Sequence, residues 1–148
     1  MNTYQSLCRA FSSRERPDHF IDSKHCEECS EHEATLASKD IDSISFMDVG
    51  NIAYSPIGFI SVEGFLYYLP GLARLITGTG EEYFLDNFLI YLENEQRRNA
   101  LNQKEKKALA DYLIELKSVI PDSIQDNLDG EDLDELIEWL NVEQVSEN

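Results

Sequence analysis

The stretch from Ser55 to Ile76 is the most apolar segment of the chain, and it constrains the fold more than any other feature. Its apolar residues recur at helical spacing, Ser61 is a good N-cap, and Glu63 places a negative charge in the first turn, where the helix dipole favours it. Because Pro70 has no amide proton and its ring crowds the preceding turn, we expect the helix to kink or divide near residues 68–71. The rest of the chain must enclose this helix.

Every other strong periodicity in the 148 residues is close to 3.6, and no turn dipeptide of a β-hairpin lies between alternating strands. The sequence therefore predicts an all-α fold, a single compact domain over residues 1–148 with about six or seven helices around the Pro-kinked central helix. The other expected helices span residues 4–11, 25–36, 45–50, 81–92, 102–120 and 129–140.

Three segments have more specific expectations. Ile44, Phe46, Met47 and Val49 are assigned to the core, and residues 93–101 are expected to be a polar connection. In the helix that follows, Asn102 and Glu105 form a capping-box pattern. The basic turn after it is expected to be a solvated face; its members are Lys104, Lys106 and Lys107.

The formal charge of -17 excludes nucleic acid and anionic membrane surfaces as expected ligands, because both would repel the chain. The central helix carries Glu63 and Arg74 and is too short for a membrane span. The N-terminus lacks the apolar central region of a secretory signal. We therefore expect a cytoplasmic protein without membrane contact, in which cysteines serve as thiols or metal ligands.

The negative charge is concentrated in the C-terminal helical segment 121–148, which holds ten acidic residues and no Lys or Arg. Such a segment is either a solvated, solubilising end or a surface that docks a basic protein partner. The second interpretation assigns partner binding to the acidic residues of the last helix: Asp129, Glu131, Asp132, Asp134, Glu135 and Glu138.

The only cluster with the residue types for site chemistry is HCEECSEH, residues 25–32. Thiolate and imidazole are preferred ligands of zinc, and a Cys-x-x-Cys spacing lets two sulfurs reach one ion. The expected ligands of such a zinc site are Cys26, Cys29, His32 and His25, with His19 and Cys8 as alternatives for the fourth position. The pattern is incomplete because no second Cys or His pair follows.

Other interpretations of the same cluster remain open. Cys29, His32 and Leu36 lie at i, i+3 and i+7, which also describes the buried stripe of an ordinary helix. A redox dithiol or a catalytic Cys/His pair would need a stabilised thiolate, which the neighbouring Glu27 and Glu28 oppose.

Two stretches together resemble a known family: HCEECSEH at residues 25–32 and SPIGFISVEGFLYYLP at residues 55–70. The family consists of small, acidic, uncharacterised bacterial proteins, classed as a domain of unknown function, with a His-Cys-x-x-Cys stretch upstream of a Phe-x-Tyr-Tyr-x-Pro segment. The similarity extends from Phe11 to Leu116 and leaves the acidic C-terminal helix outside. It implies a bacterial, cytoplasmic protein and adds no activity or catalytic residue.

No phosphate-binding glycine loop, nucleophile elbow or HExxH motif occurs in the sequence. The leading expectation is therefore a non-enzymatic interaction module, of the inhibitor or immunity type, that binds a basic partner. The alternative is a zinc-binding protein with its site in residues 25–32, and the third is a thiol redox protein.

The zinc alternative predicts that protein purified without chelator or affinity tag contains stoichiometric zinc, which the Cys26→Ser and Cys29→Ser variants lose because a thiolate ligand is removed. Elemental analysis measures this directly. Metal-free protein whose melting temperature does not change on chelation would contradict it.

Overall fold

The computed structural model describes residues 2–21 and 27–142, and within these ranges the fold is all-α, as predicted. Six of the described helices have seven or more residues, and three are shorter. The nine are α1 (Asn2–Ala10), α2 (Glu27–Ala37), α3 (Phe46–Val49), α4 (Val62–Leu75), α5 (Leu85–Tyr91), α6 (Glu95–Asn99), α7 (Gln103–Val119), α8 (Pro121–Asp126) and α9 (Gly130–Asn141). Three 3₁₀ turns are also described: η1 (Ile52–Tyr54), η2 (Pro56–Gly58) and η3 (Gly80–Glu82).

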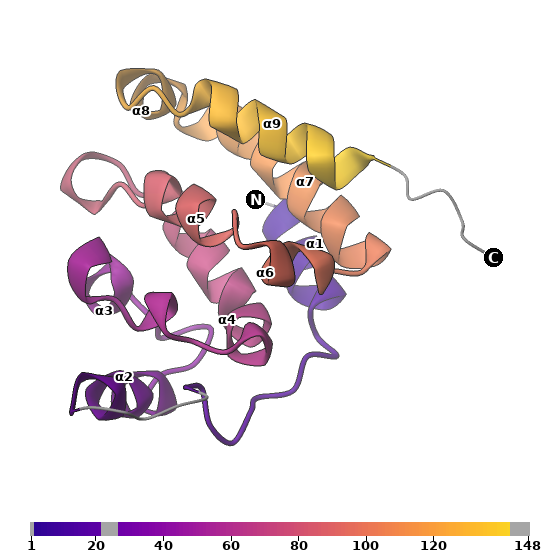
Figure 1. The fold of residues 1–148 in the computed structure, drawn as a ribbon. Coiled ribbons are helices and arrows are strands. Elements are labelled where there is room, and N and C mark those ends of the chain that lie inside the picture. The colour runs from indigo at the N-terminus through magenta and orange to yellow at the C-terminus, as the bar shows by residue number, and fades with distance from the viewer. Residues whose placement is uncertain (1, 22–26, 143–148) are drawn as a thin grey trace.

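Helix α4 lies in the middle of the molecule, and the other helices surround it (Figure 1). On one side α7 packs between α1 and α9, whereas α2 and α3 lie at the opposite end from α8 and α9. The buried apolar side chains form one continuous core. None of the described helices has the length and apolar character needed to cross a bilayer.

Helix α4 starts where the sequence predicts, but it does not divide near Pro70. The Ser61 hydroxyl oxygen accepts a hydrogen bond from the amide of Gly64 at 3.0 Å, as an N-cap should. The helix then runs unbroken through Pro70 to Leu75. Burial encloses most of its length, since every residue from 64 to 73 except Tyr67 is buried.

Helix α4 approaches the loop before α3 closely at Gly71. A Cβ atom at this position would lie only 2.8 Å from the carbonyl oxygen of Ile41, so a larger residue would push the loop away. One turn later, the Arg74 guanidinium donates to the carbonyl oxygens of Ile41 and Ile44, at 3.0 and 2.6 Å. The loop is thereby held on the helix by hydrogen bonds to its backbone.

The capping box predicted at Asn102 and Glu105 is present and has an additional role. The Asn102 side chain accepts from the Glu105 amide at 2.8 Å, and the Glu105 carboxylate accepts from the Asn102 amide at 2.9 Å. The fully buried Glu105 carboxylate also pairs with Arg14, whose Nε and Nη2 both lie 2.7 Å from its oxygens. This bidentate pair joins the chain after α1 to the start of α7 and raises the pKa of Arg14.

Two expectations about charged segments were only partly right. Residues 93–101 contain helix α6, and Arg97 within it is buried, donating to the carbonyl oxygens of Tyr91 and Ile57 at 2.9 and 2.8 Å. Its guanidinium lies 4.3 Å from the ring centroid of Phe65, and burial lowers its pKa. In the basic turn, Lys104 and Lys107 are exposed as expected, whereas Lys106 is buried, with its ammonium 4.7 Å from the ring centroid of Trp139. Arg97 and Lys106 bury their aliphatic carbons in the core. The Arg97 guanidinium donates to carbonyl oxygens, and the Lys106 ammonium lies over an aromatic ring.

We predict that Glu105→Ala lowers the free energy of unfolding by about 3 kcal/mol, because it leaves the Arg14 guanidinium unpaired and opens the capping box. Chemical denaturation measures the loss. The matched control is Lys107→Ala on the same helix, which removes the exposed pair with Asp111 and should cost no more than about 0.5 kcal/mol. Equal losses for the two variants would contradict the structural importance of the Glu105 pair.

Candidate functional site

Three residues of α2 that were predicted to bind zinc or to join the core point toward the interior of the protein. Cys29, His32 and Leu36 are 5%, 2% and 0% exposed, so the helical stripe predicted from their spacing faces the core. Glu33 is buried beside them, and its carboxylate accepts from the amides of Phe20 and Ile21 at distances of 2.9 to 3.2 Å. These bonds satisfy backbone donors of the preceding segment and fix α2 against it.

Two of the predicted zinc ligands, His25 and Cys26, lie outside the described residues, so the structure shows only part of the predicted site. Among residues 2–21 and 27–142, no three His, Cys, Asp or Glu side chains are grouped closely enough to hold a metal ion. His19 is exposed, 3.8 Å from Glu33, and Cys8 lies half-buried on α1. Neither forms such a group with Cys29 and His32, so the zinc site with Cys26 stays a prediction.

A surface hollow lies beside His32, between α2, α3 and the segment 51–56. Its volume is about 270 Å³, and its lining includes His32, Thr35, Met47, Asp48 and Tyr54. We call it the His32 hollow. The imidazole of His32 packs against two rings, with centroid distances of 4.6 Å to Tyr54 and 5.3 Å to Phe59. Its Nε2 atom is buried and has no hydrogen-bond partner among the described residues.

Two carboxylates of α2 lie beside residues that line this hollow. Glu28 Oε1 lies 4.0 Å from Nε2 of His32, and the Tyr54 hydroxyl donates a hydrogen bond to the carboxylate of Glu31. That bond, burial and the charges of Glu31, Glu28 and Glu27 raise the pKa of Tyr54 to about 12, because all oppose the phenolate. The carboxylates of α2 therefore place negative charge beside Tyr54, which lines the hollow.

The sequence did not point to the other members of this hollow. Met47 was assigned to the core but is 90% exposed, whereas Ile44 and Val49 on the same segment are buried as expected. Helix α3 is a single turn, so its exposed face carries one residue and gives no periodic signal. Tyr54 lies in a 3₁₀ turn, so a search for helical spacing does not find it either.

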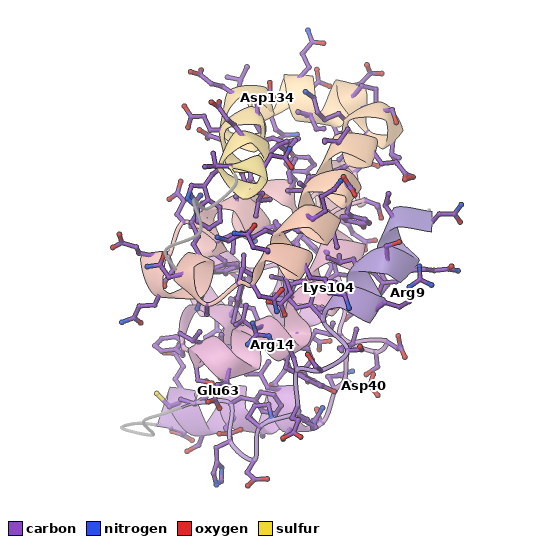
Figure 2. All side chains as sticks on the ribbon, turned by 90° about the vertical axis from the view of Figure 1, so that its right-hand side faces the viewer. Arg9, Arg14, Asp40, Glu63, Lys104 and Asp134 are labelled. Carbon is purple, nitrogen blue, oxygen red and sulfur yellow. The ribbon has the colours of Figure 1, made fainter. Side chains whose placement is uncertain are left out.

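The acidic residues predicted to bind a partner lie on α9, and five of the six are exposed: Glu131, Asp132, Asp134, Glu135 and Glu138. Figure 2 shows Asp134 at the end of the molecule away from Glu63 and Asp40. We call these five the α9 acidic face. Asp129 is only partly exposed. It is the N-cap residue of α9, and its carboxylate accepts a hydrogen bond from the Tyr83 hydroxyl at 2.5 Å. Burial, with the charges of Asp86 and Asp132, raises its pKa despite that bond.

Few cations of the described residues approach the α9 acidic face. Lys117 lies 2.6 Å from Asp134, in a pair that is about half exposed on both sides. Arg98 shares a small hollow of about 70 Å³ with Asp132 and Glu135, and its guanidinium packs on the Trp139 ring at 5.2 Å. The negative charge of α9 is therefore only partly neutralised within the described part of the chain.

Comparison with known proteins leaves the chain without an assigned relative. It matches no protein-family model, no curated protein and no solved structure. The resemblance to the family of acidic bacterial proteins therefore stays an expectation based on residues 25–32 and 55–70.

We predict that Glu31→Gln lowers the pKa of Tyr54 from about 12 toward the ordinary value of 10.0, because it removes the largest cause of the shift and one negative charge. Phenolate titration by NMR of ring-labelled tyrosine measures it. The control, Glu135→Gln on α9, should leave the Tyr54 titration unchanged. A Tyr54 that titrates near 10 in the parent protein would contradict the acidic environment.

Proposed function

We propose that this protein is a non-enzymatic interaction module, of the inhibitor or immunity type, that binds a basic protein through the α9 acidic face. It would act in the cytoplasm. The observation that supports this most is the exposure of Glu131, Asp132, Asp134, Glu135 and Glu138 together on one helix, in a chain of formal charge -17. A surface of one sign attracts a partner of the other sign and speeds its approach.

The packing of α9 supports the same proposal. Leu133, Leu136 and Leu140 are buried against the core, so the opposite side of the helix is held rigidly toward solvent. A rigid surface loses little conformational entropy when a partner binds. The single ion pair described on this face, Lys117 with Asp134, is exposed and contributes little free energy, so a partner's cations can replace Lys117.

We predict that the triple variant Glu131→Gln, Glu135→Gln, Glu138→Gln slows association with a captured partner roughly tenfold at low salt, because the attractive surface charge is removed. Partners captured on the immobilised protein are identified by mass spectrometry, and their association rates are measured by surface plasmon resonance. The difference between parent and variant should shrink at high salt, where screening shortens the range of the field.

The matched control neutralises three exposed carboxylates elsewhere, with Glu15→Gln, Glu63→Gln and Glu81→Gln. It changes the net charge by the same amount and should slow association much less, because these residues are not on α9. The proposal fails if the captured partners are not basic, or if the control slows association as much as the α9 variant does.

A further inference from the structure

The His32 hollow lies at the other end of the molecule from the α9 acidic face, with α2 and α3 at one end in Figure 1 and α8 and α9 at the other. It is therefore a separate surface, and what it binds does not depend on α9. Three of its properties point to the same kind of ligand.

The first property is an unsatisfied polar atom. His32 is 2% exposed, and its Nε2 atom has no hydrogen-bond partner among the described residues. Leaving a buried polar atom unpaired costs free energy, and such an atom in a native structure calls for an explanation. The two rings that pack on the imidazole belong to Tyr54 and Phe59, which are 45% and 46% exposed. Side chains this exposed change rotamer readily, so the imidazole can be uncovered without a change in the core.

The second property is charge. Glu28 Oε1 lies 4.0 Å from Nε2 of His32, so one nitrogen of a ligand can donate to both atoms at ordinary hydrogen-bond distances. Glu31 adds a second carboxylate through its bond with Tyr54. Asp48 also lines the hollow, but it is held by its cap on α3 and by Lys39 at 3.9 Å. The ligand group that these features select is a cationic donor with several N–H groups.

The third property is an apolar edge that no described segment covers. Met47 is 90% exposed and lines the hollow together with the half-exposed ring of Tyr54. Phe59, whose ring packs on His32, is 46% exposed. Aromatic faces bind a guanidinium by cation–π attraction, and exposed methionine packs on varied partner surfaces. A small free cation would leave this edge in water, whereas a peptide would bury it.

We propose that the His32 hollow docks an arginine side chain of a protein partner. The guanidinium donates to Nε2 of His32 and to the Glu28 carboxylate, and it stacks on the ring of Tyr54. The residues that flank the arginine in the partner's sequence pack on Met47 and Phe59. Arginine fits better than lysine because its planar, forked donor group can bond two acceptors while it stacks on a ring.

The test is a titration of the full-length, isotope-labelled protein with the blocked peptide Leu-Arg-Leu, followed by NMR. The expected result is a dissociation constant at least tenfold lower than for Leu-citrulline-Leu, which keeps the shape of arginine without its charge. The side-chain nitrogens of His32 should shift on binding. Methylguanidinium alone should bind more weakly than the peptide, because it leaves the apolar edge exposed.

Two variants test the named contacts, and each has a matched control. Glu28→Gln should weaken Leu-Arg-Leu binding roughly tenfold, whereas Glu81→Gln, at an exposed carboxylate outside both proposed surfaces, should not change it. Tyr54→Ala should weaken it, whereas Ile114→Ala, an equally exposed apolar residue on α7, should not. All four positions are on the surface, so the variants are expected to fold, and circular dichroism checks this.

The inference is overturned if the arginine and citrulline peptides bind equally, if no binding is measured, or if Glu81→Gln weakens binding as much as Glu28→Gln. Methylguanidinium that binds as tightly as the peptide would also overturn it, since the hollow would then be a site for a free small cation. None of these outcomes alters the α9 proposal, which depends on Glu131, Glu135 and Glu138 with a captured basic protein.

Discussion

The need to enclose helix α4 determines much of this structure. From residue 64 to residue 73 the helix is buried almost all round, so other elements must cover each of its sides. The covering elements are tied to it by polar groups as well as by apolar contact. Tyr112 of α7 donates to the carbonyl oxygen of Ala73 at 2.7 Å, and the Tyr68 hydroxyl lies 2.5 and 2.6 Å from carbonyl oxygens of Leu36 and Lys39. Such bonds keep buried backbone groups satisfied where the chain is not regular.

Three of the buried charged side chains in the described part of the chain bind the backbone. Glu33 accepts from two amides, Glu105 closes a cap and binds Arg14, and Arg97 donates to two carbonyl groups of separate segments. Each connects elements that are distant in sequence, and each has its partners in place, which offsets the cost of removing a charge from water. This leaves the remaining acidic residues free to collect on the outside, above all on α9.

The two ends of the molecule therefore present different surfaces. At one end α9 exposes carboxylates on a rigid helix and can attract a basic protein over a distance limited by salt. At the other end α2, α3 and the segment 51–56 form a hollow in which an unpaired imidazole nitrogen, carboxylates and exposed rings are combined. We propose that α9 attracts a partner over a distance and that the His32 hollow recognises one side chain, at opposite ends of the molecule.

The sequence alone determined the helical class, the Ser61 cap, the capping box at Asn102, and the inward face of α4, because these depend on residues within a few positions of each other. It also located the exposed acidic residues. Tertiary structure decided that Arg97 and Lys106 are buried and that Met47 is exposed. It also assembled the His32 hollow from three segments. Those outcomes depend on contacts between residues that are far apart in the sequence, and local periodicity contains no information on such contacts.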